Sequence, residues 1–325
     1  MMTARRPRPT IFAVLVLAAW SIVLSQPMHA RADEPARLKL ATYNVLNLFD
    51  VFDDPYTTDE ETRVKPRDQI NAVAQAIRAI NPDVIAFQEV ENAGALRAMF
   101  DEELGDLRFR YIVAGESNNT RGIRVAVASR LPIRRIISHR FTTLRLPDET
   151  RTWDFARDLM QVEVEVTQDS APGANDAQIL DLFIVHFKSK RDGTDDPNSN
   201  KWRLAEALGA RKILNDAAAA NPSRWQAIVG DFNDTGESPV IGAFTSPTAQ
   251  APGHKLIDVH AKLPAAEAYS YIPEQYRSKI DFMLVNTAMR RALDEASPAV
   301  LHDRELTFGS DHAPISATFQ IPPKP

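Results

Sequence analysis

Three short polar motifs stand at the ends of apolar runs, and they constrain the fold of this chain more than any other feature. They lie far apart in the sequence, so only a fold that gathers strand ends at one edge can bring their acidic, amide and imidazole groups together. The sequence therefore predicts a strand-rich domain with a polar site at one edge. The motifs are Gln88-Glu89, Gly230-Asp231-Phe232-Asn233 and Gly309-Ser310-Asp311-His312.

The chain between these motifs alternates strand-like and helix-like segments. Apolar residues at helical spacing, with Pro66 suited to a first turn and Asn81-Pro82 to a stop, predict a helix over 66–80. Strand-like runs outnumber helical ones, which favours one α+β domain over a simple alternation of strand and helix. Further helices are expected at 92–104 and 202–220, and strands at 38–45, 83–87, 111–114, 123–129, 159–166, 179–186, 226–230, 279–285 and 315–319.

The run 159–166 alternates apolar and polar residues, which is typical of a half-buried strand. Its valines are expected to face the core and its polar residues, Gln161, Glu163 and Glu165, to face outward. Two polar stretches, 169–176 and 192–200, are expected to be loops.

Residues 1–32 have the pattern of a signal peptide. Arginines stand at 5, 6 and 8, an apolar run of 14 residues follows over 11–24, and Ala30-Arg31-Ala32 resembles a cleavage site. The run is short for a bilayer span, and no second apolar span follows. We therefore expect a secreted or periplasmic protein without a stable membrane anchor, whose residues 33–325 form a single domain. An uncleaved N-terminal anchor is the alternative.

Composition excludes some classes of protein. The chain has no cysteine, so it forms no disulfide and no thiolate metal site. The leader holds four arginines and no acid, so residues 33–325 keep 34 of the 38 basic side chains against 43 acidic ones, a net charge of −9. Tight metal-free binding to DNA depends on many basic side chains, so it is not expected, whereas a local basic patch can still hold one phosphate.

The first two motifs offer oxygen ligands for a cation. Glu89 ends a short apolar run, and a hard ion such as Mg²⁺ is often held by one or two carboxylates with water and substrate phosphate. Asp231 and Asn233 are two residues apart, so in extended backbone they share a face, where an acid and an amide can orient water and phosphate. The alternatives are a helix start for Glu89 and an ordinary Asx turn for the second motif.

Two histidines complete the set. His312 has the pKa range of a general base near neutral pH, and Asp281, an acid inside an apolar strand, is its candidate orienting partner. His186 ends a strand and precedes two lysines at alternate positions, Lys188 and Lys190, an arrangement that suits a phosphate clamp, although a solvated strand end is the alternative. Asn44 interrupts a buried strand, and its amide needs a partner such as metal or phosphate.

These motifs, taken in order, resemble the endonuclease/exonuclease/phosphatase superfamily with its deoxyribonuclease-like fold, and the signal peptide is similar to that of its secreted bacterial nucleases. The resemblance covers about residues 38 to 320 and implies an α/β four-layered sandwich of two packed mixed sheets flanked by helices. It depends on Thr42-Tyr43-Asn44-Val45, Gln88-Glu89, His186, Gly230-Asp231-Phe232-Asn233, Ile280-Asp281-Phe282 and Ser310-Asp311-His312.

The resemblance also implies roles. Glu89, Asn44 and Asp311 would hold Mg²⁺ or Mn²⁺. The catalytic residues would be His312 as general base, Asp281 as its partner, His186 at the phosphate, and Asp231 with Asn233 orienting water. Lys188, Arg124 and Arg157 are candidate phosphate contacts, since an arginine fork suits phosphate. One departure is Leu46, where some relatives carry an acid that would serve a second metal.

Three functions remain open at this point. The first is a monomeric, metal-dependent phosphodiesterase that cuts DNA, and RNA as a further substrate. The second is a phosphodiesterase or phosphatase for phospholipid headgroups or other small phosphate esters. The third is a non-catalytic binding module on the same fold.

Overall fold

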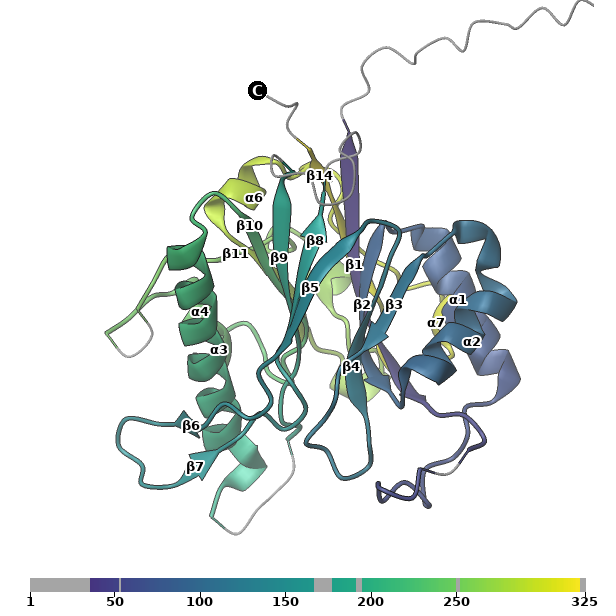
Figure 1. The fold of residues 1–325 in the computed structure, drawn as a ribbon, viewed down its shortest axis with the longest axis horizontal. Coiled ribbons are helices and arrows are strands. Elements are labelled where there is room, and N and C mark those ends of the chain that lie inside the picture. The colour runs from purple at the N-terminus through teal and green to yellow at the C-terminus, as the bar shows by residue number, and fades with distance from the viewer. Residues whose placement is uncertain (1–35, 53, 167–176, 191–194, 250–251, 322–325) are drawn as a thin grey trace, which may run out of the picture. The chain divides into compact units, whose positions relative to one another are not determined.

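Two six-stranded sheets with helices on their outer faces make up the described part of the chain (Figure 1). The computed structural model describes residues 36–52, 54–166, 177–190, 195–249 and 252–321. The expected signal peptide 1–32 and polar loop 169–176 lie outside these residues, as do positions 192–194 of the second polar loop. No helix among the described residues is both long and apolar enough to cross a bilayer.

The first sheet has the strand order β13-β14-β1-β2-β4-β3. Its central strands β1 and β2 are parallel, and the other neighbours are antiparallel. Both central strands therefore finish at the same edge. The strands are β1 (Arg37–Leu48), β2 (Val84–Val90), β3 (Tyr111–Ala114), β4 (Arg124–Ser129), β13 (Ala299–Val300) and β14 (Ile315–Gln320).

The second sheet has the strand order β11-β12-β10-β9-β8-β5. Here β9 and β10 are the parallel pair, so this sheet also has two central strands that end together. The strands are β5 (Ile133–Ser138), β8 (Met160–Glu165), β9 (Ile179–His186), β10 (Trp225–Asp231), β11 (Ile257–Asp258) and β12 (Asp281–Val285), and β6 (Leu144–Arg145) pairs separately with β7 (Thr152–Trp153).

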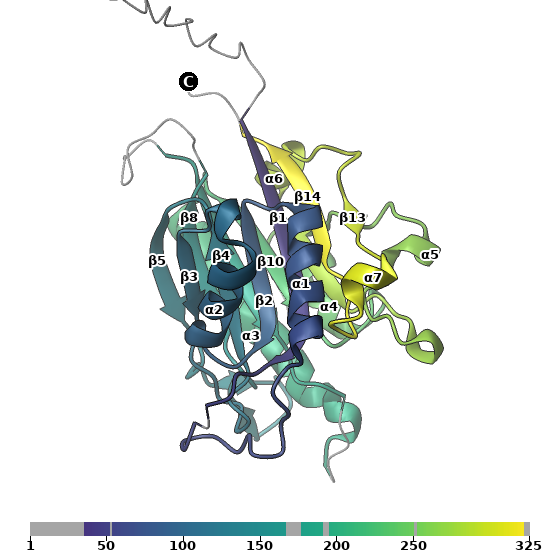
Figure 2. The same ribbon diagram turned by 90° about the vertical axis from the view of Figure 1, so that its right-hand side faces the viewer.

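Helices cover the outer face of each sheet (Figure 2). On the first sheet lie α1 (Arg67–Ile80), α2 (Ala93–Glu103) and α7 (Arg304–Thr307), and on the second α3 (Asn200–Ala220) and α4 (Pro239–Thr245). The N-terminus of α2 is capped by Asn92, whose side chain accepts from Ala95 N, so Glu89 is not its cap. Short helices complete the list: η1 (Gly105–Leu107), η2 (Pro197–Ser199), α5 (Ala265–Ala268), η3 (Glu274–Tyr276) and α6 (Thr287–Arg291).

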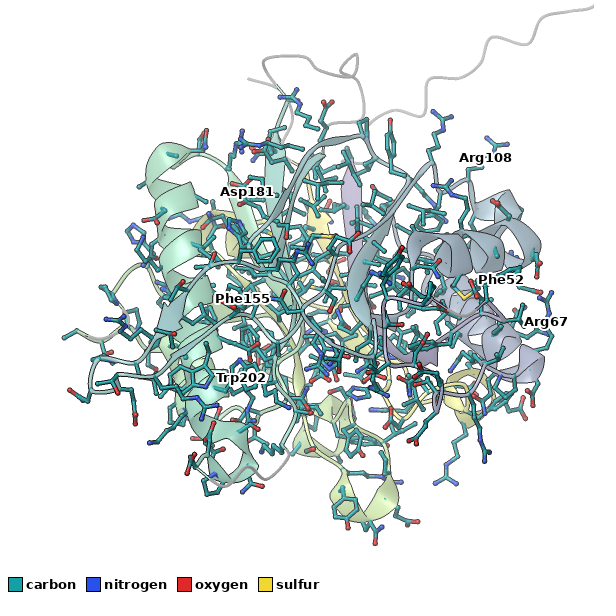
Figure 3. All side chains as sticks on the ribbon, turned by 60° about the horizontal axis from the view of Figure 1, so that its bottom comes forward. Phe52, Arg67, Arg108, Phe155, Asp181 and Trp202 are labelled. Carbon is teal, nitrogen blue, oxygen red and sulfur yellow. The ribbon has the colours of Figure 1, made fainter. Side chains whose placement is uncertain are left out.

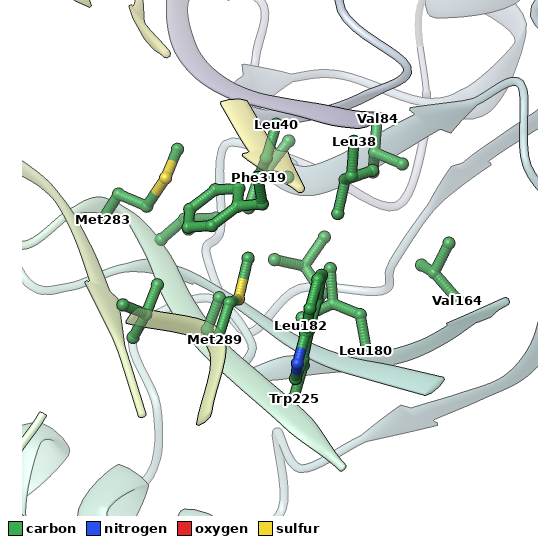
Figure 4. Packing of buried hydrophobic residues seen from close by; sticks show 14 of the residues in the cluster. Leu38, Leu40, Val84, Val164, Leu180, Leu182, Trp225, Met283, Met289 and Phe319 are labelled. Carbon is green, nitrogen blue, oxygen red and sulfur yellow. The ribbon is translucent and has the colours of Figure 1, made fainter. Parts of the chain in front are cut away.

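Apolar side chains fill three layers. The layer between the sheets joins residues such as Leu40 and Val84 of the first sheet to Leu182 and Met283 of the second (Figure 4). Each fully buried aliphatic side chain there contributes about 1.5–3 kcal/mol. Two further layers separate the sheets from α1 and α2 and from α3 and α4. The four-layered sandwich of two mixed sheets is thus confirmed.

Some local expectations were wrong. The polar residues of β8, Gln161, Glu163 and Glu165, are all buried, because the outer face of that strand is covered and arginines accompany its acids; Arg224 lies 3.1 Å from Glu163. Five strands had no sequence signal: β6, β7, β11 and β13 have two residues each, and β5 interrupts its apolar pattern with Arg134 and Arg135.

Candidate active site

The predicted polar motifs meet where the central strands of both sheets end, on the side of the molecule that Figure 3 brings forward. Strand register explains the meeting. Asp231 of β10 is paired with His186 on the parallel strand β9 and with Asp281 on the antiparallel strand β12. In the other sheet, Asn44 of β1 is paired with the residue before Glu89.

The side chain of Asn44 joins the two sheets. Its Nδ2 lies 3.2 Å from Asp231 Oδ2, 3.4 Å from Glu89 Oε1 and 3.5 Å from His312 Nε2. Asn44 is buried, so this amide meets the need for a partner that its position in a strand creates. It holds two carboxylates from different sheets beside one imidazole.

His312 is paired with Asp281, whose Oδ2 lies 2.7 Å from the imidazole Nδ1. Its other nitrogen, Nε2, lies 3.9 Å from both Asp231 Oδ2 and Asp311 Oδ1. Burial alone lowers the pKa of His312, but these three carboxylates outweigh burial and raise the pKa to about 10. In the metal-free protein the ring is therefore protonated at neutral pH, which is not the charge state that the expected general base needs.

The pKa of Asp231 is also shifted, but into the neutral range. Burial, together with the neighbouring Asp281, raises the pKa of Asp231 to about 7. A carboxylate with such a pKa can take up a proton near neutral pH. Burial also raises the pKa of Asp311, and burial followed by the nearby Arg157 lowers the pKa of His186.

The backbone around these groups is unusual. Gly230 has φ 131°, and a Cβ there would lie 2.1 Å from Val185 O, so only glycine permits the close approach of β9 and β10. Asn233 has φ 52°, and its N–H donates to Asp231 Oδ1 at 2.7 Å. The Asp231–Asn233 segment is therefore an Asx-type turn and not the extended strand expected. The turn still brings Asn233 Nδ2 within 3.3 Å of Asp231 Oδ2.

Glu89 is held by the peptide that joins Leu46 to Asn47. Both residues of this peptide have positive φ, 48° and 54°, and Glu89 itself has φ 63°. The Asn47 N–H donates to Glu89 Oε2 at 3.1 Å, while the buried Lys65 Nζ donates to Leu46 O at 2.9 Å. Strained backbone of this kind persists only where its surroundings fix it, and it collects at functional sites.

The donor set fits a hard divalent cation. Glu89, Asp231 and Asp311 supply carboxylate oxygens in one pocket, and the buried Asp311 Oδ1 has no hydrogen-bond partner among the described residues. By distance alone, Asp231, Asp281 and His312 form a group of ligand atoms within 4.8 Å. In that group Asp281 is already bonded to the protonated His312 and does not line the cavity, whereas Glu89 and Asp311 do.

A cavity of about 660 Å³ opens over these groups. Glu89, Asp231, Asn233, Asp311 and His312 contribute to its lining. The further lining residues are His186, Arg121, Arg157, Ser189, Lys190, Thr235, Tyr271, Tyr276, Ser278 and Ile280. Asn44 and Asp281 lie behind this lining, bonded to residues that form it.

Arg157 is the most unusual side chain of the cavity. It is buried, and among the described residues no carboxylate lies within ion-pair distance of its guanidinium. Its Nη1 donates to Phe187 O at 3.0 Å, and its buried Nε has no partner. Buried charges need a counter-charge, so this guanidinium is suited to a bound anion.

Two of the expected phosphate contacts lie outside the cavity lining. Arg124 donates to Glu91 O and Gly122 O and lies 3.8 Å from Asp54, so it ties a loop to β2. The Lys188 ammonium lies over the Trp202 ring, 5.4 Å from its centroid. The lining instead includes Lys190, the second lysine of the expected phosphate clamp after His186, and Arg121, which was not expected as a phosphate contact. Nothing in the local sequence marks which of several neighbouring basic residues turns inward.

A family model matches most of the chain and agrees with the motifs that meet at the site. Residues 41–312 match the Endonuclease/Exonuclease/phosphatase family. A comparison with curated proteins found no match.

Solved structures with this fold are similar over most of the chain. The human Nocturnin catalytic domain with bound sulfate has 15% identity and a TM-score of 0.60, and the match covers 88% of this chain and 95% of that one. TDP2 from C. elegans has 17% identity and a TM-score of 0.59, covering 90% and 78%. A family protein from Bacteroides vulgatus has 16% identity and a TM-score of 0.56, covering 88% and 99%.

At these identities the solved structures establish the fold alone, whereas the family model spans every motif from within β1 to the histidine before β14. The chain therefore belongs to the endonuclease/exonuclease/phosphatase family of hydrolases.

Proposed function

We propose that this protein is a metal-dependent phosphodiesterase whose main substrate is DNA, with RNA as a further substrate. The observation that carries the proposal is the buried guanidinium of Arg157, which has no ion-pair partner within the described part of the chain and lines the same cavity as the acids and imidazoles. A phosphate on Arg157 would lie beside both the cation ligands and a proton acceptor.

Glu89 and Asp311 would hold Mg²⁺ or Mn²⁺, which when bound offsets negative charge on the phosphoryl oxygens and the leaving group. Asn44, expected as a third ligand, turns its Nδ2 toward Glu89 and Asp231 while its Oδ1 accepts from Leu46 N, so it would orient these carboxylates instead. Arg157 and His186 bind the phosphate, and Asn233 orients the water. The low pKa of His186 keeps its imidazole neutral, so one ring nitrogen can donate to a phosphate oxygen.

The proton acceptor is better assigned to Asp231 than to His312. A base must be unprotonated before the reaction, and with a pKa of about 10 His312 is protonated at neutral pH, whereas Asp231 has a pKa of about 7. In this proposal Asp231 accepts the proton of water. His312, as an imidazolium held by Asp281, donates a hydrogen bond to the phosphoryl group.

A second candidate substrate is a phospholipid headgroup or another small phosphate ester. The loop after β1 exposes Val51, Phe52 and Tyr56, the last to 95%, and such side chains could contact a lipid surface (Figure 3). Acidic residues at 50 and 54 lie in the same loop and oppose docking to an anionic surface. We therefore place this candidate second.

We further propose that the protein acts as a monomer outside the cytoplasm, in the periplasm or the medium. The support is the signal-like pattern of residues 1–32 and the absence of cysteine. Secretion of the protein with loss of those residues, read by mass spectrometry of the exported form, tests the location.

The test of function is hydrolysis of plasmid DNA by residues 33–325 with Mg²⁺, with Mn²⁺ and with EDTA, beside the His312→Ala variant. We expect cutting that needs metal and that the variant lacks. A folded, metal-binding protein that leaves DNA and RNA intact would refute the nuclease proposal, and bis(p-nitrophenyl) phosphate, phospholipids and phosphomonoesters would then decide the second candidate.

A further inference from the structure

Glu206 is a fully buried carboxylate behind the active site that the proposed reaction does not use. It lies on α3, the helix that covers the second sheet, and its side chain faces the segments leading into the cavity. Its Oε1 accepts from Ala156 N at 2.8 Å and its Oε2 from Lys188 N at 2.7 Å. One carboxylate thus joins two segments that are 32 residues apart in the sequence.

The second of these bonds belongs to a peptide with charges on both sides. The N–H of the Phe187–Lys188 peptide donates to Glu206, and its C=O accepts from Arg157 Nη1 and from Asn233 Nδ2, each at 3.0 Å. Hydrogen bonds at the two ends of one peptide polarise it and strengthen each other. The carboxylate of Glu206 therefore acts on Arg157 through a peptide.

The first bond acts on Arg157 from its own backbone. Ala156 immediately precedes Arg157, so Glu206 fixes both the main chain that carries the guanidinium and the carbonyl that orients it. Figure 3 shows Trp202 on α3 and Phe155, the residue before Ala156, near the same helix. Trp202 Nε1 donates to Asp154 O at 2.9 Å. The guanidinium Nε is left without a protein partner.

Arg203 supports the same peptide segment from the opposite side. It lies three residues before Glu206 on the helix and is fully buried. Its Nη1 donates to Lys188 O at 3.1 Å, and its Nε donates to Asp234 Oδ2 at 3.1 Å, next to Asn233. Residues 156–157, 187–188 and 233–234 are all fixed by two side chains on one face of α3.

We propose that Glu206 is a positioning residue for phosphate binding, which orients Arg157 through the Phe187–Lys188 peptide and through Ala156 N. The expected effect on catalysis rests on the proposed function. The expected effect on phosphate binding can be measured without turnover. A direct carboxylate partner would neutralise the guanidinium, whereas a partner that acts through a peptide orients the guanidinium and leaves its charge for a phosphate.

The experiment compares Glu206→Gln with Glu163→Gln, a matched change of a buried, arginine-paired carboxylate on β8 that contacts no residue of the cavity. Glutamine keeps the shape but can accept through one atom only, so one amide loses its partner. Burial raises the pKa of Glu206 to about 7, so all measurements are made at pH 8. The readouts are KM and kcat on a thymidine phosphodiester, and the binding of inorganic phosphate by calorimetry in EDTA.

We expect Glu206→Gln to raise KM and weaken phosphate binding about tenfold with a smaller loss of kcat, while the rise in melting temperature with Mn²⁺ is kept. Glu163→Gln should leave KM and phosphate binding unchanged. In an Arg157→Leu background, Glu206→Gln should weaken phosphate binding by less than a further twofold, because its effect passes through Arg157.

Unchanged phosphate binding in Glu206→Gln, or equal and additive losses in the Arg157→Leu background, would overturn the inference. If Glu206→Gln does not fold, Glu206→Asp, which withdraws the carboxylate from both amides, replaces it in the same comparisons. Failure of the proposed function would give a different result, because the unchanged protein would then cut no phosphodiester. The calorimetric comparison would still show whether Glu206 supports phosphate binding.

Discussion

Replacing Asp281 with asparagine should move the titration of the His312 ring from well above neutral pH toward neutrality. Asparagine keeps an oxygen that can accept from His312 Nδ1, so the tautomer and the ring position are retained. Only the carboxylate charge at 2.7 Å is removed. The substitution therefore separates the charge of His312 from its geometry.

The size of the effect follows from the pKa of His312. Its rise from 6.5 to about 10 corresponds to a preference for the charged ring on the order of 5 kcal/mol, against the opposing effect of burial. Asp281 is the largest of the three carboxylate contributions. We therefore expect Asp281→Asn to lower the pKa by at least about 2 pH units, which is a factor of about 100 in the protonation equilibrium.

The assay is an NMR titration of the His312 ring in the metal-free protein, followed by pH profiles of kcat/KM. We expect ring titration near pH 10 in the unchanged protein and below pH 8 in the variant. If His312 acts as an imidazolium, the loss of activity in Asp281→Asn grows as pH rises from 6 to 9. If it acts as a base, kcat/KM of the variant instead rises with pH over the same range, up to the lowered pKa of the ring, and the variant does not lose activity through a change in charge.

The pH dependence of the free energy of unfolding gives an independent check of the charge on His312. A histidine with a raised folded pKa stabilises the native state fully below its unfolded pKa of about 6.5, and that contribution is lost as pH rises through about 10. The stability difference between the protein and Asp281→Asn should therefore be largest near pH 6 and shrink toward pH 10. A His312 ring that titrates near 6.5, or that titrates alike in both proteins, would refute the reasoning.

Three further predictions concern single residues. Gly230→Ala should lower the free energy of unfolding in urea by at least about 2 kcal/mol, because it combines φ 131° with a Cβ 2.1 Å from Val185 O; Gly242→Ala, whose Cβ would meet nothing within 4 Å, is the control and should not destabilise. Burial lowers the pKa of His260 to about 4, so acid should destabilise the protein by about 3 kcal/mol between pH 6.5 and 4, and His260→Gln should lose this dependence in urea titrations. Glu89→Gln should lose most of the rise in melting temperature that Mn²⁺ causes, and an unchanged rise would remove Glu89 as a ligand.

The sequence predicted the fold well because the central strands are continuous apolar runs with polar residues at their ends. β9 and β10 were recognised for that reason, and the family resemblance then supplied the packing of the two sheets. Edge elements were missed where the physical signal is weak: β5 carries two arginines among its isoleucines, and the short pairs close only through tertiary contacts. Helix α1 was found to within one residue because its apolar spacing is regular.

At the site, residue identity was easier to predict than conformation. His312 and Asp281 are joined by a hydrogen bond between residues 31 apart, and an acid within an apolar strand was a sufficient signal for that pairing. Arg121 and Lys65 were missed because nothing in a local pattern shows that a loop cation turns toward the acids. The charge of His312 was also beyond sequence reasoning, since it depends on three carboxylates from three separate segments.

In each half of the site, one peptide has a cation on its carbonyl and a carboxylate on its N–H, but the group that lines the cavity is the carboxylate in one half and the cation in the other. In the first sheet, the Leu46–Asn47 peptide has the Lys65 ammonium on its carbonyl and the Glu89 carboxylate on its N–H. In the second, the Phe187–Lys188 peptide has the Arg157 guanidinium on its carbonyl and the Glu206 carboxylate on its N–H.

In each pair one charge lines the cavity and the other is withdrawn: Glu89 and Arg157 line it, while Lys65 and Glu206 do not. A direct ion pair would have neutralised the charge with which Glu89 attracts a cation and the charge with which Arg157 attracts a phosphate. An intervening peptide fixes the orientation of each group without placing an opposite charge directly on it. The cost is two strained residues beside Glu89, which the buried hydrogen bond from Lys65 offsets.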